Sequence, residues 1–505
     1  MKQYLMGIDI GTSACKVAVF DREGHVVSSA SAGYPVYYPR PGWAEQNPRE
    51  WWQAVCNGVK QALYAGKLSG GEIAGVGIDG QSWSAVLVDK RGRVLANTPI
   101  WMDTRAEGIC RELNEQVGEE AIFALAGNSL QPAYTTAKIL WYQRNQPREY
   151  READKVLQSN SYIAYRLTGA LTQDLSQGYG LHCFDIHKGQ WDMDMCSRLG
   201  IRPELLPDLY PCHAVIGTVT GQAAEECGLS AGTPVAAGGL DAACGTLGAG
   251  VIHPGETQEQ GGQAGGMSIC MDSPKADPRL ILGYHVVPDQ WLLQGGTTGG
   301  GGVMRWLEQE LGDYERLEGP RQGKSSLELF NRLAEAVEPG CDGVVFLPYM
   351  SGERSPIWDA KAKGVYYGLD FGKTKGHLIR AAMEGVAFAL RHNLEAAREA
   401  GAAVGELRAM GGSANSLLWT QIKADITGLP IAVPASDTAT TLGAAILAGV
   451  GTGLYKSFEE AVSQTVETKR RHQPNPANRD AYDRNYRIYR SLYRDLKGLM
   501  REEEP

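Results

Sequence analysis

One short segment near the middle of the chain restricts its fold more than any other. Residues 235–245 read Val-Ala-Ala-Gly-Gly-Leu-Asp-Ala-Ala-Cys-Gly. This order predicts a buried strand, a diglycine turn and a helix of small residues. The turn places Asp241 at the start of the helix, where free backbone amides attract anions. Two interpretations follow for this carboxylate: it caps the helix, as Asp often does, or it is a catalytic group beside a ligand.

Length and composition restrict the class of protein. A chain of 505 residues is too long for one hydrophobic core, so we expect two large domains. The net charge of −9 argues against nucleic acid or an anionic membrane as the main partner. The ten cysteines include no Cys-x-x-Cys pair, which argues against zinc and disulfide frameworks and favours reduced thiols. Without a signal peptide or an apolar window of membrane length, the sequence predicts a cytoplasmic protein.

The first residues combine an acidic side chain with a hydroxyl-rich turn. Tyr4–Ile10 has the apolar pattern of a strand, and Gly11-Thr12-Ser13 follows it as the tip of a hairpin. Such a tip can surround a phosphate group, and Lys16 supplies a cation close by. Asp9 could hold Mg²⁺ directly or through water. A plain hairpin is the alternative, although it does not require the order Asp-x-Gly-Thr-Ser-x-x-Lys.

Several segments together resemble the FGGY carbohydrate kinases of the actin and sugar-kinase superfamily, and the xylulokinases among them. The resemblance starts at Gly7–Ser13 and at the Gly-Trp-Ala-Glu-Gln-Asn-Pro block of residues 42–48. It is most specific in Phe346–Arg354 and in the signature over residues 364–385. It implies an α/β fold of two ribonuclease-H-like domains with a cleft between them. We expect residues 1–250 to form the sugar-binding side and residues 251–505 to form the nucleotide-binding side.

The resemblance also implies roles for individual residues. Asp241 would be the catalytic base that accepts a proton from a sugar hydroxyl, and Asp9 would position Mg²⁺. Three residues would contact the sugar: Gln81, Trp83 and Asp103. The nucleotide would contact two phosphate loops and an adenosine-binding turn: Gly11, Thr12, Ser13, Lys16, Gly262, Gln263, Gly411, Gly412 and Asn415.

Three of these positions carry an open question. Trp83 stands where xylulokinases have histidine, which puts D-xylulose itself in doubt as the substrate. The second loop reads Gly262-Gln263-Ala264 and lacks the hydroxyls usual in the family, so its backbone amides would have to hold phosphate. Asp103 could grip sugar hydroxyls, or it could cap a helix expected over residues 104–116.

The sequence therefore predicts ATP-dependent phosphorylation of a sugar hydroxyl, with ATP and Mg²⁺ required. A ketopentose such as xylulose is the first candidate substrate. Two alternatives stay open: a kinase of this fold for L-xylulose, ribulose, gluconate or a signalling polyol, and a nucleotide-gated ATPase module that phosphorylates no sugar. The expected partners are the sugar and ATP, without nucleic acid or membrane, and a homodimer is left open.

Overall fold

Two large β-sheets form the centre of the molecule. The computed structural model describes residues 3–436 and 438–502, and each sheet in it has seven strands. The first sheet has the order β13-β14-β5-β1-β2-β3, with β15 beside β5, and the second has the order β18-β19-β17-β16-β22-β23-β24. The strands of the first sheet are β1 Tyr4–Ile10, β2 Ala14–Phe20, β3 Val26–Gly33, β5 Ile73–Gly80, β13 Val215–Thr218, β14 Pro234–Ala236 and β15 Gly239–Leu240. Those of the second are β16 Glu256–Gly261, β17 Gly265–Met271, β18 Ile281–Tyr284, β19 Trp291–Thr297, β22 Glu406–Met410, β23 Ile431–Pro434 and β24 Thr468–His472.

The two sheets repeat one topology. In the first, β1 pairs antiparallel with β2 and parallel with β5. In the second, β16 pairs antiparallel with β17 and parallel with β22. The turn at Gly11-Thr12-Ser13 joins β1 to β2, and the turn at Gly262-Gln263-Ala264 joins β16 to β17 in the corresponding place. The two predicted phosphate loops are therefore equivalent positions of a duplicated fold.

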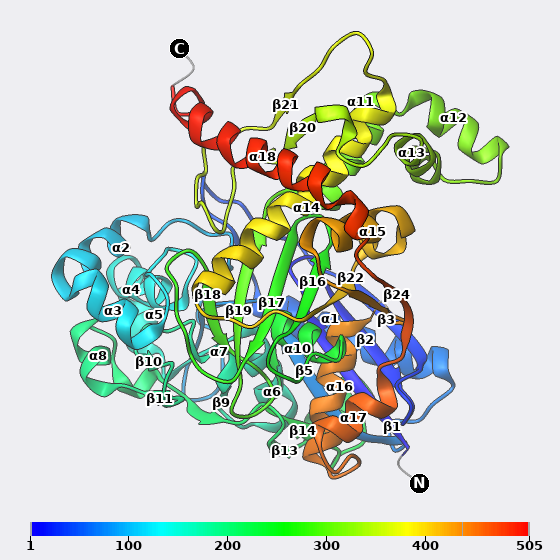
Figure 1. Cartoon of the computed structure of the whole chain (residues 1–505). Coiled ribbons are helices and arrows are strands. Elements are labelled where there is room, and N and C mark those ends of the chain that lie inside the picture. Colours follow the sequence, from blue (N-terminus) through cyan, green and yellow to red (C-terminus); the bar gives the residue numbers. More distant parts are fainter. Residues whose placement is uncertain (1–2, 437, 503–505) are drawn as a thin grey trace.

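Helices cover both sheets and form two outlying groups (Figure 1). They are α1 Pro48–Gly66, α2 Glu107–Leu113, α3 Glu119–Ala126, α4 Thr135–Asn145, α5 Pro147–Glu152, α6 Ser159–Thr168, α7 Leu175–Gly178, α8 Met193–Arg198, α9 Gly221–Cys227, α10 Asp241–Gly248, α11 Gly301–Leu311, α12 Asp313–Arg321, α13 Ser326–Glu335, α14 Lys375–Glu399, α15 Leu417–Thr427, α16 Ala439–Gly451, α17 Phe458–Thr465 and α18 Arg479–Met500. Short strand pairs complete the fold: β4 Glu45–Gln46 with β7 Thr98–Pro99, β6 Val86–Val88 with β8 Lys155–Leu157, β9 Thr172–Asp174 with β12 Asp208–Tyr210, β10 Phe184–Asp185 with β11 Gln190–Trp191, and β20 Val345–Leu347 with β21 Val365–Tyr367.

Helix α1 illustrates how local sequence sets an element. The Asn47 side chain accepts the Arg49 N–H at its N-terminus, and Pro48 occupies the first turn, where it loses no hydrogen bond. The predicted apolar face is buried against β2 and β3: Trp51, Trp52, Val55, Val59 and Leu63. At the other end of the chain, tyrosines recur at helical spacing along α18, and Tyr482, Tyr486 and Tyr489 are buried.

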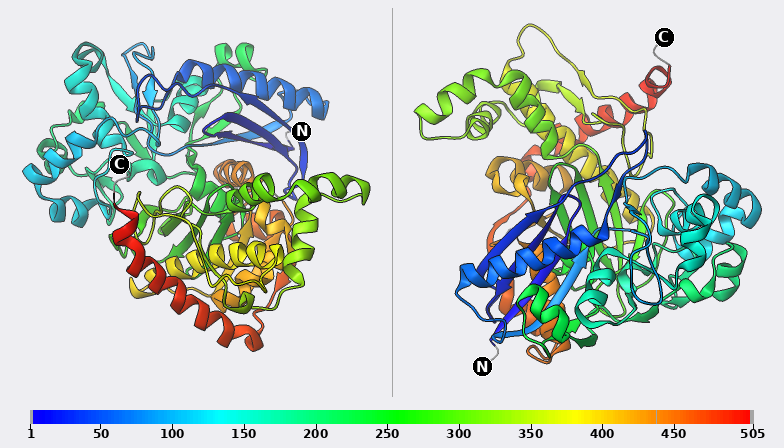
Figure 2. Two further views of the ribbon diagram at one scale, coloured as in Figure 1. Left: turned by 90° about the horizontal axis from the view of Figure 1, so that it is seen from above. Right: turned by 180° about the vertical axis from the view of Figure 1, so that it is seen from behind.

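The two halves of the chain meet at a crossing of α10 with α16. Figure 2 shows the first half, in blue to teal, on one side and the second half, in green to red, on the other. Helix α16 belongs to the second half, yet it packs on β1 and β5 of the first sheet and on α10. Any side chain at four glycines would overlap backbone across these contacts: Gly7, Gly77, Gly248 and Gly443. A helix of the second half therefore packs on the sheet of the first.

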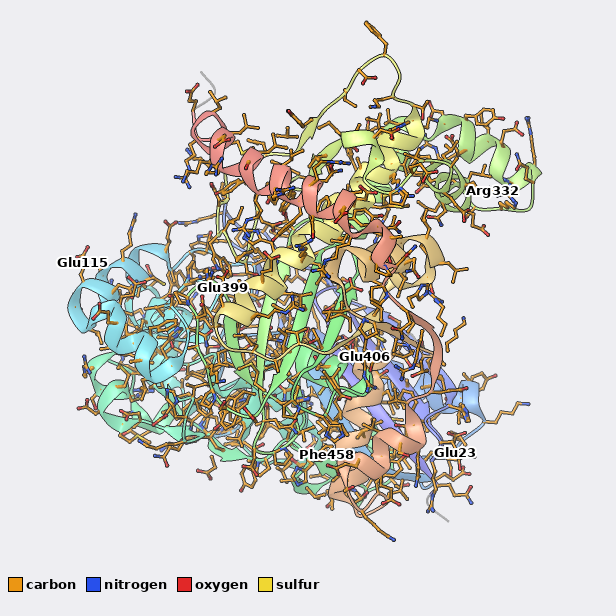
Figure 3. The ribbon with its side chains drawn as sticks, viewed as in Figure 1. Glu23, Glu115, Arg332, Glu399, Glu406 and Phe458 are labelled. Carbon is orange, nitrogen blue, oxygen red and sulfur yellow. The ribbon has the colours of Figure 1, made fainter. Side chains whose placement is uncertain are left out.

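Side chains fill the space between the sheets and the helices around them (Figure 3). The largest apolar cluster contains residues of both halves, including Leu5, Leu247, Ile269 and Leu442. A second cluster lies within the first half, between the sheet and α1. In the described part of the chain, no helix combines the length and apolar character needed to span a bilayer.

Candidate active site

Asp241 lies at the first position of α10, directly after the strand β15. One of its carboxylate oxygens accepts the Ala242 N–H at 2.7 Å. The residue before the helix, Leu240, makes no capping hydrogen bond with its side chain. The side chain lines a cavity of about 450 Å³ that both halves of the chain surround. Burial raises the pKa of Asp241 to about 7, and the negative charge of Asp9 acts in the same direction. A carboxylate with this pKa exchanges protons readily near neutral pH.

Three acidic side chains gather where β1, β5 and β15 end. Asp9 and Asp79 are paired in register on β1 and β5, and Gly239 of β15 pairs with Asp79 from the other side. Asp79 is fully buried, and both of its carboxylate oxygens lack a hydrogen-bond partner within the described residues. Burial, followed by the charges of Asp9 and Asp241, raises the pKa of Asp79 well above its ordinary value. A buried carboxylate without partners is costly, so Asp79 favours its protonated form.

The first phosphate loop borders the same cavity. Thr12 lines it, and the Thr12 carbonyl accepts the Gln46 side-chain amide at 2.7 Å. Tyr34 donates its hydroxyl to the Gly11 carbonyl at 2.5 Å, and the Ser13 carbonyl accepts the Tyr34 N–H. The Lys16 ammonium, largely exposed, lies 3.4 Å from Asp9 Oδ2. These bonds hold the loop in one conformation beside Asp9.

The second phosphate loop lies opposite and is tied to a helix N-terminus. The Gly262 and Gln263 carbonyls accept the Gly301 and Gly302 N–H groups at 2.7 and 2.9 Å, at the start of α11. Gly262 and Gln263 line the cavity that contains Asp241. Gly262 also lines a second cavity of about 500 Å³, so the two cavities adjoin at this loop. A ligand that fills both would pass along the loop backbone.

The second cavity has the composition of a nucleotide pocket. The adenosine-binding turn predicted from the sequence contributes Gly412 and Asn415, while Gly411 precedes them at the end of β22, with a φ of +82°. The opposite walls come from α11, α13 and the start of α15, including Met304, Asn331 and Trp419. Apolar and carboxamide groups on facing walls suit a flat, hydrogen-bonding base.

A buried ion pair supports the glycine loop from behind. Lys423 on α15 lies 2.6 Å from Glu259 on β16, and it also donates to the Ser413 hydroxyl at 2.7 Å. Lys423 and Glu259 are almost fully buried. In the duplicated fold Gln260 of β16 has the place that Asp9 has in β1, and Glu259 precedes it by one residue, so Glu259 and Lys423 are not the counterpart of Asp9 and Lys16. Ser413 lines the nucleotide cavity, so the pair connects directly to its wall.

Aromatic and carboxamide side chains form the walls around Asp241. Trp83 lines the cavity with a backbone φ of +59°, and its ring lies against Tyr134 and Tyr179. Its indole N–H is buried and has no partner among the described residues. Trp83 therefore presents an apolar surface to the cavity. The opposite wall comes from the second sheet and offers Gln258, Gln260 and Gln294.

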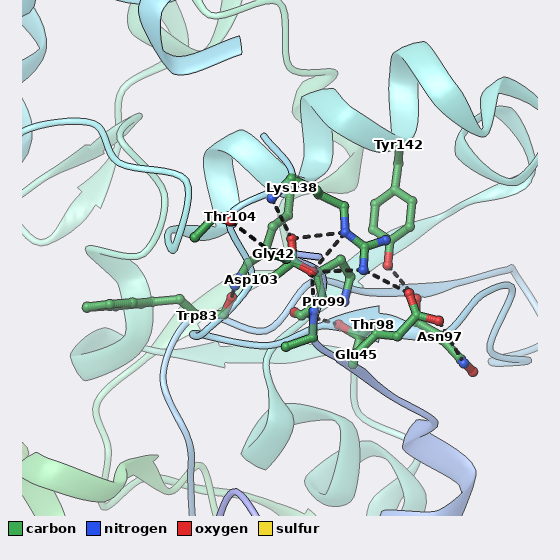
Figure 4. A network of polar contacts seen from close by, with 12 residues as sticks. Gly42, Glu45, Trp83, Asn97, Thr98, Pro99, Asp103, Thr104, Lys138 and Tyr142 are labelled. Atoms are coloured by element: carbon green, nitrogen blue, oxygen red, sulfur yellow. Dashed lines mark hydrogen bonds and ion pairs between the residues drawn. The ribbon is translucent and has the colours of Figure 1, made fainter. Parts of the chain in front are cut away.

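Asp103 does not cap the helix that follows it. Figure 4 shows it inside a network of polar contacts that includes Glu45 and Thr104, and Asp103 is buried. Asp103 forms a buried ion pair with Arg105 at 2.8 Å and accepts the Ala44 N–H at 2.7 Å. Helix α2 starts only at Glu107, without a side-chain cap. The predicted helix cap is therefore wrong, whereas the sugar contact of Asp103 stays a prediction; in this structure its oxygens accept N–H groups of Ala44 and Arg105.

Gln81 is also displaced from the cavity. It is buried, and its amide donates to the Gln46 Oε1 at 2.7 Å. Gln46 in turn donates to the Thr12 carbonyl. Gln81 therefore supports the first phosphate loop through Gln46, and the surrounding cavity wall is made by its neighbours Ser82 and Trp83.

Three residues of the site were missed from the sequence. Asp79 ends a strand that reads as ordinary core, so nothing marked its carboxylate as functional. Arg354 belongs to a segment that, in the sequence, indicated only the family resemblance. In the structure it lines the cavity, and its guanidinium lies 5.3 Å from the centre of the Trp101 ring. Ser325 caps α13 and lines the nucleotide cavity.

The fold and the site together define a two-domain phosphotransferase, with an acidic cluster between two equivalent glycine loops. Family models of the FGGY carbohydrate kinases match here: the N-terminal domain over residues 4–248 and the C-terminal domain over residues 269–452. The chain is 32% identical over 502 residues to the xylulose kinase of Staphylococcus epidermidis, covering 99% of this chain and 98% of that protein. It is 30% identical to the gluconokinase of Bacillus licheniformis, covering 99% and 97%. The crystal structure of xylulose kinase from Rhodospirillum rubrum superposes with a TM-score of 0.89 at 31% identity, covering 98% and 99%.

The chain belongs to the FGGY family of carbohydrate kinases. It is an enzyme that phosphorylates a sugar at the expense of ATP. The two-domain α/β fold expected from the sequence is confirmed.

Proposed function

We propose that the chain transfers the γ-phosphoryl group of ATP to a hydroxyl of a ketopentose, with xylulose as the first candidate. The observation that carries the proposal is the position of Asp241, with a pKa of about 7, in a cavity that adjoins a nucleotide-shaped cavity at Gly262. Xylulose kinases are among the relatives that match the whole chain, which favours a ketopentose.

Asp241 is the base in this proposal. A sugar hydroxyl that donates a hydrogen bond to Asp241 loses its proton to the carboxylate as its oxygen attacks phosphorus. The Ala242 N–H holds one carboxylate oxygen and leaves the other for the hydroxyl. Most of the remaining catalysis is positioning, because phosphoryl transfer requires little covalent chemistry from the protein. The backbone of the two glycine loops, at Thr12 and Gly262, is placed to orient the phosphates.

We infer that Asp9 and Asp79 hold Mg²⁺. Within the described residues, no group of three or more acidic, histidine or cysteine side chains has the arrangement of a complete metal site. Mg²⁺ is usually bound through one or two carboxylates, with waters and substrate phosphates completing its shell. The partnerless oxygens of Asp79 beside Asp9 suit that donor set. When bound, Mg²⁺ neutralises charge on the phosphates.

An aldonate such as gluconate is the second candidate substrate. Arg354 places an exposed guanidinium in the wall of the Asp241 cavity, where it can pair with a carboxylate. Gluconokinases also match the whole chain at 30% identity. A ketopentose has no charge for Arg354 to neutralise, so the two candidates make different demands on this residue.

An ATP-consumption screen tests the function and separates the candidates. Pentuloses, hexuloses, alditols and aldonates are compared at equal concentration, with purified protein and MgCl₂. Arg354→Gln serves as a probe, because it removes the charge and keeps a hydrogen-bonding side chain. We expect the highest kcat/KM with a pentulose and a similar substrate ranking in the variant. Preference for an aldonate that collapses in Arg354→Gln would replace xylulose by gluconate, and no sugar-dependent ATP consumption would reject the proposal.

A further inference from the structure

A third cavity lies in the first half of the chain and shares no lining residue with the two cavities of the active site. Its volume is about 540 Å³, comparable with that of the nucleotide cavity. Four elements surround it: the start of α1, the turn after β6, α6 and α9. Four arginines line it, and we call it the arginine cavity: Arg49, Arg91, Arg93 and Arg166.

Acidic side chains compensate only part of this charge. Arg93 pairs with Asp89 at 2.7 Å, and Arg166 pairs with Glu226 at 3.0 Å. Arg49 and Arg91 form no ion pair within the described part of the chain, although one Arg49 nitrogen donates to the Val94 carbonyl. Glu226 is the only acidic residue among those that line the cavity. Two guanidinium charges are therefore left without a partner in a concave site.

The arginines converge on a pair of tyrosines. The Tyr162 hydroxyl accepts Arg166 Nη1 at 3.4 Å. Burial raises the pKa of Tyr162, and the hydrogen bond from Arg166 and the charges of Arg166 and Arg49 oppose that increase. The Tyr165 hydroxyl donates to the Arg91 carbonyl at 3.4 Å.

The turn that carries Arg91 is fixed against α6. Gly92 has a φ of +71°, and any side chain there would overlap the Tyr165 ring. Since the turn cannot move away from Tyr165 without losing this fit, Arg91 approaches the cavity from a defined backbone position. The cations of α1, α6 and this turn are thus held by separate rigid elements, as preorganised anion sites require.

We propose that the arginine cavity binds a small phosphomonoester, such as a sugar phosphate. A guanidinium presents paired N–H donors that match phosphate oxygens, and two uncompensated arginines match the charge of a phosphate dianion. The hydroxyls of Tyr162 and Tyr165 supply polar contacts for the part of the ligand that carries the phosphate. The volume accommodates a pentose phosphate or a mononucleotide.

Equilibrium binding of ribose 5-phosphate, inorganic phosphate and free ribose tests the proposal by calorimetry. The variant Arg49→Gln/Arg91→Gln removes the two uncompensated charges. Arg111→Gln/Arg151→Gln is the matched control, because it removes two exposed arginines on α2 and α5 and lowers the net charge equally. Sugar phosphate bound at the active site contributes equally in all three proteins, so only the difference between them reports on the arginine cavity.

We expect ribose 5-phosphate to bind wild type and control alike, and to bind the arginine-cavity variant about 100-fold more weakly, at about tenfold for each lost charged contact. Gln222→Glu, which adds a carboxylate at an exposed position of the wall, should weaken binding as well. Free ribose should not bind at this site. Binding that is equal in all proteins, or that falls equally in the control, would overturn the proposal. Binding of inorganic phosphate without any gain from the sugar would reduce the site to one for free phosphate and reject the phosphomonoester.

Discussion

Asp241→Asn is the most direct test of the proposed chemistry. The asparagine amide is nearly isosteric with the carboxylate, and it can still accept the Ala242 N–H through its oxygen. Folding and sugar binding should therefore survive. Because a positioned base typically contributes about 10²–10⁴ in rate, kcat should fall by that factor while the KM for the sugar changes little.

The pKa of Asp241 gives this prediction a second measurable part. Burial raises that pKa to about 7, so the carboxylate is ionised above this pH and protonated below it. The rate should therefore rise with pH and level off above about 7; one unit lower, about one-tenth of the protein has the ionised base. A cation beside Asp9 opposes the shift, so higher Mg²⁺ concentrations should move the midpoint to lower pH.

A coupled ADP-release assay from pH 5.5 to 8.5, at several Mg²⁺ concentrations, measures both parts. Circular dichroism and the Tm of the variant provide the folding control. The reasoning fails if Asp241→Asn retains more than about a third of wild-type kcat, since a base contributes far more than that. A wild-type profile that is flat over this range would reject the assigned pKa even if the variant is inactive.

Four further predictions concern the surrounding residues. Trp83→His replaces the apolar wall by a polar ring and should move the substrate ranking toward D-xylulose; an unchanged ranking in the substrate screen would leave Trp83 with a packing role only. Lys423→Met leaves Glu259 charged and buried and should lower the free energy of unfolding in urea by about 3–5 kcal/mol, whereas Lys423→Met/Glu259→Gln should recover most of the loss. Asp79→Asn should raise Tm, and it should do so more at pH 8 than at pH 5. The raised pKa of Asp79 means that ionisation of this carboxyl group opposes folding as the pH rises above about 4. A Tm difference between variant and wild type that is the same at both pH values would contradict the raised pKa. Sugar binding should also close the cleft, which solution scattering would record as a smaller radius of gyration and an activity assay as faster ATP hydrolysis. An unchanged radius together with an unchanged rate of ATP hydrolysis would contradict closure.

Local patterns in the sequence predicted the elements that local chemistry controls. The strand Tyr4–Ile10 has the predicted bounds, and α1 begins at Pro48 as its Asn-Pro signal indicates. Asp241 begins α10 as the sequence predicts, two residues after the diglycine, although Gly239 belongs to strand β15 and only Gly238 has a positive φ. These features depend on residues within a few positions of one another, so a single sequence contains them.

The errors came from partners that lie far away along the chain. Asp103 accepts the Ala44 N–H, and its neighbour Arg105 also pairs with Glu45, so residues nearly sixty positions earlier fix the network around Asp103. Asp79 looks like one more residue of a buried strand, and only the register with β1 brings it beside Asp9. The arginine cavity combines positions on four separate elements. None of these tertiary contacts corresponds to a periodic pattern in the sequence.

The four glycines at the crossing of α10 and α16 have a mechanical consequence. At Gly7, Gly77, Gly248 and Gly443 the surfaces meet backbone to backbone, and no side chain from either half interlocks with the other at these points. Two surfaces without protruding side chains can rotate against each other while their backbones stay in contact. Rotation of one lobe over the other would keep the backbones in contact at these points, while the apolar side chains around them, among them Leu247 and Leu442, would have to repack. A methyl group at any of the four would lie 1.8–1.9 Å from a backbone carbonyl oxygen of the facing element, so the two elements would have to separate and the angle between the lobes would change.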